Sequence, residues 1–93
     1  MLMNALSPLL EPIGLSMPSL EDSPFARVVK RLIGGRSLRE AARESGISHT
    51  RISDMQFGVV PSYRLLEKFA KGLGIEGQDL RELFEAANYP PPP

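Results

Sequence analysis

The sequence predicts an all-α fold, and three observations support that prediction. Between residues 24 and 87, apolar residues recur three and four positions apart in five successive segments, as on the buried face of a helix. Serine or aspartate, residue types that cap helix N-termini, stands at the start of each segment. No stretch of the chain reads convincingly as a strand. We therefore expect a protein built from helices alone.

The first predicted helix begins at a cap residue, Ser23, followed by Pro24 at the first helical position, where proline is well tolerated. Two glycines, Gly34 and Gly35, end it. Its apolar stripe is made of Phe25, Val28, Val29, Leu32 and Ile33. This spacing predicts an amphipathic helix with one buried face.

The second and third predicted helices are separated by a single glycine. Ser37 caps the second helix, Gly46 ends it, and Ser48 caps the third. The residues expected to face inward are Leu38, Ala41 and Ala42 on the second helix, and Ile52 and Met55 on the third.

The fourth and fifth predicted helices complete the domain. Ser62 caps the fourth, and Gly72 and Gly74 mark a fraying end. Asp79, with Glu82 three residues later, fits a capping box that starts the fifth helix. The apolar faces consist of Leu65, Leu66, Phe69, Ala70 and Leu73 on the fourth helix, and Leu80, Leu83, Phe84 and Ala87 on the fifth.

Composition narrows the class of protein. The 93 residues suffice for one small domain, and the absence of cysteine is typical of a reducing cytoplasm. No apolar run approaches the roughly 18 residues of a membrane span, and the N-terminal residues lack the basic start of a secretory signal. We expect a soluble cytoplasmic protein without a metal or other cofactor, because His49 is the only histidine and there are no thiols.

Charge is balanced over the chain but unevenly distributed. Lysine plus arginine and aspartate plus glutamate each total 11. Residues 25–68 contain nine basic and four acidic side chains, a net charge of +5, whereas residues 1–24 and 69–93 have net charges of −3 and −2. The basic centre permits contact with a phosphate backbone without requiring it.

The chain divides into three parts. Residues 1–22 contain Pro8, Pro12 and Pro18, and we expect a flexible proline-rich arm. Residues 23–89 form the helical domain, and residues 90–93 are a polyproline tail. Three alternatives to disorder remain open for the arm: its leucines and methionines cover the domain, swap to a second subunit, or bind a protein partner.

The junction between the second and third helices has the features of a helix-turn-helix unit. Such a unit needs a small residue where the helices touch, a glycine where the backbone takes positive φ, and inward apolar residues on its second helix. Ala42 supplies the first and Gly46 the second. Ile47, Ile52 and Met55 supply the apolar set. Each match alone is weak, but the intervals together favour this unit.

These motifs resemble the Cro and lambda-repressor-like helix-turn-helix family, also called the xenobiotic-response-element family. The similarity runs through SLREAARESGISHTRISDMQFG and PSYRLLEKFAKGLGI to the ending LRELFEAANYPP, over roughly residues 25–90. It implies a compact five-helix lambda-repressor-like bundle that binds double-stranded DNA, usually as a homodimer, and regulates transcription.

The resemblance also implies roles for individual residues. The third helix, about residues 48–57, is the recognition helix that enters the major groove. The expected base contacts are His49, Thr50, Arg51 and Asp54, and the expected phosphate contacts are Arg36, Ser37, Arg39, Ser48, Ser62, Tyr63 and Arg64. We expect the fifth helix to form the dimer interface, through whichever of its apolar residues the core leaves exposed. The candidates are Leu80, Leu83, Phe84 and Tyr89. Leu38, Gln56 and Phe57 depart from residues frequent in the family.

The leading hypothesis is a sequence-specific repressor acting as a homodimer on a two-fold operator. An antitoxin and a phage or mobile-element repressor are two forms of it that the sequence leaves open. The alternative is a protein-interaction module on the same bundle, such as an antitoxin or adaptor that binds a partner through residues 1–22, with weak or no DNA binding. Catalysis is not expected, because there is no cysteine and the only histidine, His49, has no serine or carboxylate at a recognisable catalytic spacing.

Overall fold

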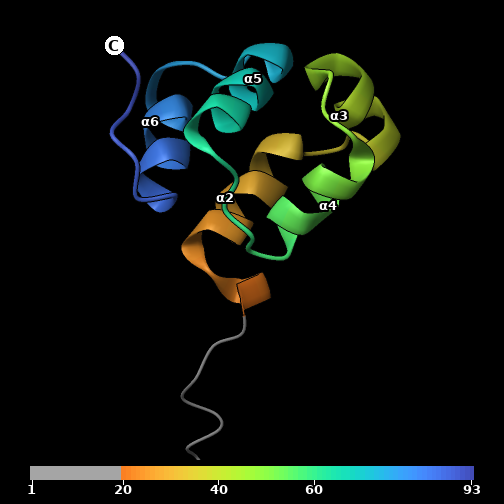
Figure 1. Cartoon of the computed structure of the whole chain (residues 1–93), viewed down its shortest axis with the longest axis horizontal. Helices are drawn as coiled ribbons and strands as arrows, with labels where there is room; N and C mark the ends of the chain where they lie inside the picture. Colours follow the sequence, from red (N-terminus) through yellow and green to blue (C-terminus); the bar gives the residue numbers. More distant parts are fainter. Residues whose placement is uncertain (1–19) are drawn as a thin grey trace, which may run out of the picture.

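A computed structural model describes residues 20–93 of the chain. These residues form one turn of 3-10 helix and five α-helices, with no strand among them (Figure 1). The elements are η1 (Leu20–Asp22), α2 (Pro24–Ile33), α3 (Leu38–Ser45), α4 (His49–Gln56), α5 (Tyr63–Leu73) and α6 (Gly77–Ala86). The all-α prediction is confirmed. Of the predicted arm, residues 1–19 lie outside the described residues, and residues 20–22 form η1.

Four of the five helices begin at the serines that the sequence identified. Ser23, Ser37, Ser48 and Ser62 have extended backbones, and the Oγ of each accepts a hydrogen bond from the amide three residues later. Each such bond satisfies an amide that the helix itself leaves without a partner, and is worth about 1 kcal/mol. The helix starts are therefore fixed by local sequence.

The predicted capping box at Asp79 and Glu82 is wrong. Helix α6 begins three residues earlier, with Glu76 and not Asp79 at the cap position, and the Glu76 side chain makes no capping hydrogen bond. Both carboxylates instead bind Arg31 of α2, at 3.1 Å from Asp79 and 2.6 Å from Glu82, and so tie α6 to α2. The capping box of this chain lies at Ser37 and Glu40, where the serine Oγ accepts from the Glu40 amide and the Ser37 amide donates to the Glu40 carboxylate.

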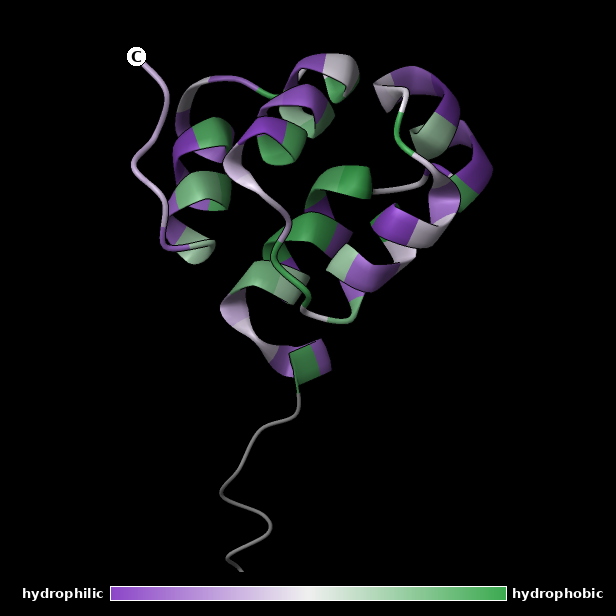
Figure 2. Cartoon of the chain, in the orientation of Figure 1, coloured by the Kyte–Doolittle hydropathy of each residue, from purple (hydrophilic) through white to green (hydrophobic). Residues whose placement is uncertain are grey.

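The core lies where α2 meets the other helices. Figure 2 shows α2 in the middle of the bundle, largely hydrophobic in colour, and α3 at the edge, largely hydrophilic. The largest fully buried side chains are Phe25, Val29, Ile52, Met55, Leu66, Phe69, Leu83 and Phe84. They come from α2, α4, α5 and α6, so one apolar cluster holds these helices together. No helix of the described residues is long and apolar enough to cross a lipid bilayer.

The sequence predicted that Gly72 marks the fraying end of its helix, and the structure shows that it does not. It lies inside α5, which continues to Leu73 and is capped by Gly74 in the left-handed conformation, with φ 70°. A Cβ atom at position 72 would lie 2.4 Å from the Ser45 Cα and 2.7 Å from the Glu44 carbonyl oxygen. The glycine therefore allows α5 to pack directly against the end of α3.

The C-terminal end of the domain is joined to the loop before α5. The Tyr89 hydroxyl donates a hydrogen bond of 2.6 Å to the Pro61 carbonyl oxygen. The Tyr63 ring lies between the rings of Phe84 and Tyr89, with edge-on contacts at centroid distances of 5.3 and 5.4 Å. Residues far apart in the sequence thus fix the position from which α5 starts.

Removing the Tyr89 hydroxyl should weaken this junction. We expect Tyr89→Phe to lower the free energy of unfolding by about 1 kcal/mol, because the half-buried Pro61 carbonyl loses its partner while the ring contacts remain. Urea unfolding of both proteins measures the difference. An unchanged midpoint would show that water replaces the hydroxyl without cost.

Candidate functional site

The predicted hinge is present between α3 and α4. Helix α3 ends at Ser45, and Gly46 follows in the left-handed conformation with φ 75°, where a side chain is disfavoured. The Gly46 amide donates to the Ala42 carbonyl at 2.8 Å. Ala41 is buried and Ala42 half-buried, so Ala41 is the residue of this pair in the core. The two helices are separate, as the helix-turn-helix prediction requires.

Apolar residues anchor α4 from its inner face. Ile47, Ile52 and Met55, the predicted inward set, are 4%, 0% and 1% exposed. With its inner face held in this way, α4 presents the opposite face to solvent. This burial determines which side chains point outward.

Ser45 is a structural residue that the sequence did not single out. It is buried, and its hydroxyl donates to the Ala41 carbonyl at 2.7 Å while accepting from the Ile47 amide at 3.2 Å. One hydroxyl thus bonds both the end of α3 and the residue after the glycine. A serine at the end of a helix was the only sequence signal for this role.

The outer face of α4 carries the four predicted base-contacting residues. His49, Thr50, Arg51 and Asp54 are all exposed. No ion pair joins Arg51 to Asp54 in the described part of the chain, so the guanidinium and the carboxylate remain available to a ligand. Both line a hollow of about 310 Å³ that extends past Val59 and Val60 to the start of α5. The structure therefore brings polar side chains together on one solvent-facing surface.

Five of the seven predicted phosphate contacts are exposed. They are Ser37, Arg39, Ser48, Ser62 and Arg64. The three serines each use an oxygen lone pair to cap a helix, which leaves the hydroxyl proton free to donate. Arg39 and Arg64 form no ion pair within residues 20–93.

The other two predicted phosphate contacts have structural partners. The Arg36 Nε donates to the Glu44 carboxylate at 2.7 Å, and its Nη1 donates to the Leu32 and Ile33 carbonyls at 3.3 Å. A phosphate would have to compete with these bonds, so we assign Arg36 to the end of α2. Tyr63 is half-buried, with its ring packed between two other aromatic rings.

The predicted dimer residues also divide into two groups. Leu83 and Phe84 are 0% exposed within the single chain, so they belong to its core and cannot contact a second subunit. Leu80 and Tyr89 are half-buried. Leu80 shares a hollow of about 160 Å³ with Pro92 and Pro93 of the C-terminal tail.

One surface was not predicted from the sequence. The exposed large apolar side chains of residues 20–93 are Leu20, Phe57, Val59 and Val60, which are 41–65% exposed. They are neighbours, because Gly58 lies against Leu20 so closely that a Cβ atom there would be 2.3 Å from the Leu20 carbonyl oxygen. We call these four residues the apolar patch. The signal available in the sequence was the apolar run after the third predicted helix.

A family model described as helix-turn-helix matches residues 30–80, more than half of the chain. The matched region extends from the end of α2 into α6 and includes the hinge, α4 and the whole of α5. The comparison with curated proteins found no match, and neither did the comparison with solved structures.

Proposed function

The chain belongs to the Cro and lambda-repressor-like helix-turn-helix family of DNA-binding transcription regulators, and on this premise we propose that it is a repressor that binds a palindromic operator as a homodimer. The observation that carries the proposal is the exposure of His49, Thr50 and Arg51 together at the N-terminal end of a helix whose opposite face is buried. In helix-turn-helix proteins this end of the second helix meets the base edges in the major groove.

Each exposed side chain of α4 matches a chemical feature of the groove. Arg51 can donate two hydrogen bonds to guanine, and Thr50 can bond a base edge or touch the thymine methyl group. His49 can donate to an acceptor such as guanine N7, and Asp54 can accept from a cytosine amino group. These contacts give the protein its sequence preference.

Backbone contacts orient the protein on the duplex. Ser37, Ser48 and Ser62 stand at the N-termini of three helices, where the helix dipole and free amides favour phosphate. Arg39 and Arg64 add positive charge beside two of them. Such contacts give affinity and fix the register, whereas base contacts provide the specificity.

A homodimer places two copies of α4 about 34 Å apart, on half-sites one turn of DNA apart. Of the residues expected at the dimer contact, Leu80 and Tyr89 remain candidates, since both are partly exposed. We further propose that the protein acts in the cytoplasm, and that repression results from occupying a promoter. Residues 1–22 are the proposed contact for any protein partner.

Selection of bound sequences from a random pool of duplexes tests the proposal. We expect an inverted repeat with half-site centres about 10 base pairs apart, one turn of DNA. Affinity for this sequence should fall steeply with salt, because phosphate contacts release counterions. Recovery of no preferred sequence, or binding that is insensitive to salt, would contradict the proposal.

The apolar patch favours a second candidate, a protein-interaction module on the same bundle. Exposed apolar residues gathered in one place often mark a contact with another protein. Phe57 also stands where family members frequently carry a polar or basic residue. A second copy of this chain is the partner that can be tested directly.

Polar substitution of the patch separates association from folding. We expect Phe57→Ser with Val60→Ser to lower the free energy of unfolding by about 2 kcal/mol, because these side chains are only 52% and 41% exposed and lose the apolar surface that they bury. Self-association measured by sedimentation should weaken, and Arg43→Ser, at an exposed position of α3, serves as the control. Unchanged self-association would exclude the patch as the contact, and a much larger loss of stability would assign it to the core.

A further inference from the structure

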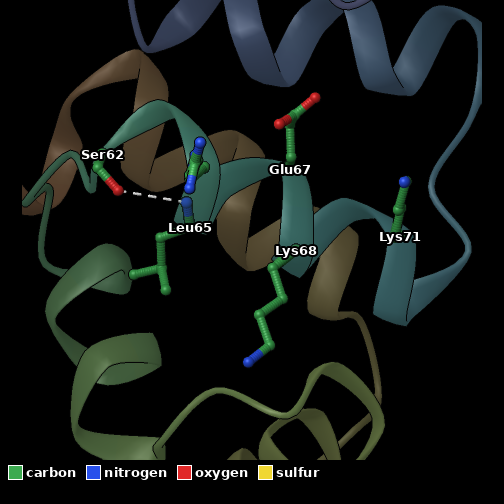
Figure 3. Close-up of a pocket in the computed structure, with 6 residues that line it drawn as sticks. Ser62, Leu65, Glu67, Lys68 and Lys71 are labelled. Atoms are coloured by element: carbon green, nitrogen blue, oxygen red, sulfur yellow. Dashed lines mark hydrogen bonds between the residues drawn. The ribbon is translucent and has the colours of Figure 1, made fainter.

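A shallow hollow of about 500 Å³ follows the exposed side of α5 from Ser62 to Lys71 (Figure 3). Leu65 and Ser62 also line the hollow beside Arg51 and Asp54, so the two hollows form one continuous surface. The shared residues lie at the start of α5, whereas α5 as a whole packs along α3, the first helix of the helix-turn-helix unit.

Lys68 extends from this hollow to the turn of the helix-turn-helix unit. A Cβ atom built on Gly46 would lie 3.3 Å from the Lys68 Cε and 3.7 Å from its Nζ. The end of the lysine side chain thus lies against the turn, two residues before the cap of α4. Figure 3 shows Lys68 pointing toward that side of the bundle, while Glu67 and Lys71 point the opposite way.

The ammonium group of Lys68 has no compensating carboxylate. It forms no ion pair with any of residues 20–93, and the acid that lines the same hollow, Glu67, points away from it. The helix-turn-helix unit and α5, residues 38–73, carry six exposed basic side chains: Arg39, Arg43, Arg51, Arg64, Lys68 and Lys71. The same residues include four acids, Glu40, Glu44, Asp54 and Glu67, of which Glu44 is paired with Arg36. The net charge of this region is therefore +2, which favours a polyanion modestly.

We propose that Lys68 contacts a backbone phosphate of the bound duplex next to the N-terminus of α4. The contact lies outside those proposed above, and it rests on the proposed DNA binding. Lysine suits it, because an ammonium acts as a point charge with three donors and reads no base pattern.

The test is the salt dependence of DNA binding by Lys68→Ala, with Lys71→Ala as the matched control from the same helix and hollow. One lost phosphate contact reduces the slope of log affinity against log salt by about 0.9. When salt is raised from 50 to 200 mM, the affinity of both proteins falls. The factor by which it falls should be about three- to fourfold smaller for Lys68→Ala than for the wild type. Its preference for operator over random duplex should stay unchanged. Lys71→Ala should behave as the wild type, and Lys68→Arg should retain the slope.

The outcomes distinguish this inference from the function on which it rests. If the wild type binds its operator with a steep slope and Lys68→Ala keeps that slope, the Lys68 contact is wrong while DNA binding stands. Equal losses in Lys68→Ala and Lys71→Ala also overturn the contact, because they indicate diffuse charge. A wild-type chain without sequence preference overturns the repressor proposal and the contact with it. Matching thermal unfolding of the variants verifies that they fold.

Discussion

Valine in place of Gly72 should destabilise the domain by about 3 kcal/mol, the upper end of what an overpacked site costs. Intrinsic preference predicts the opposite sign, because valine favours a helix over glycine by a few tenths of a kcal/mol. The clash outweighs that preference. The new Cβ would lie 2.4 Å from the Ser45 Cα and 2.7 Å from the Glu44 carbonyl oxygen, and both are backbone atoms that cannot rotate away.

Thermal unfolding measures the effect, since 1 kcal/mol corresponds to about 4–8 °C in a domain of this size. Gly72→Ala should give a smaller loss, because it adds the Cβ alone and gains about 1 kcal/mol of helix preference. Gly35→Ala is the control, because a Cβ there has no atom within 4 Å. A stabilised Gly72→Val protein would show that α3 and α5 can separate without cost.

Loss of the α4 side chains should have the largest effect on DNA binding. We expect Arg51→Ala to lower affinity for the selected operator about 10- to 100-fold, which matches the 1–3 kcal/mol of a bidentate base contact. His49→Ala should have a smaller effect, because a single hydrogen bond is lost. Stability should hardly change, because both side chains are exposed and neither forms an ion pair within residues 20–93.

The comparison of two duplexes separates base reading from charge. On random DNA, Arg51→Ala should lose only the effect of one positive charge, so the preference for the operator should shrink. Arg81→Ala, an exposed arginine of α6, removes the same charge away from α4 and should keep the preference. Equal loss on operator and random duplexes would assign Arg51 to the phosphates instead.

Helix starts were predictable where a capping hydrogen bond between residues close in sequence fixes them. Ser23, Ser37, Ser48 and Ser62 each bond an amide three residues away, so a short window of sequence contains the whole interaction. The start of α6 was not predictable in this way. Its acidic residues bind Arg31, which is 48 and 51 residues distant, and no local pattern reveals such a pair.

The hinge and the exposed face of α4 were predictable for the same local reason. A glycine four residues after a small residue, followed by spaced apolar residues, specifies which side of α4 is buried. Periodicity could not tell the core of α6 from a subunit interface, so it left open which apolar residues of α6 the core would take, and Leu83 and Phe84 are the ones that are fully buried. Periodicity also could not show that Glu44 forms an ion pair with Arg36, or that Gly72 stands where α5 approaches the end of α3 closely.

The separation of acidic and basic side chains has a consequence for how the protein meets its target. With a formal net charge of zero, the molecule has no monopole attraction for a duplex at long range. Ions screen any field beyond about 8 Å at physiological ionic strength, so a duplex senses the basic face only in the last nanometre of approach. Near α4 the duplex meets Arg51, which has no ion pair within residues 20–93, whereas near α6 two of the carboxylates are already paired with Arg31. Without long-range attraction, we expect association with DNA at rates near the unsteered range of about 10⁵–10⁶ M⁻¹s⁻¹.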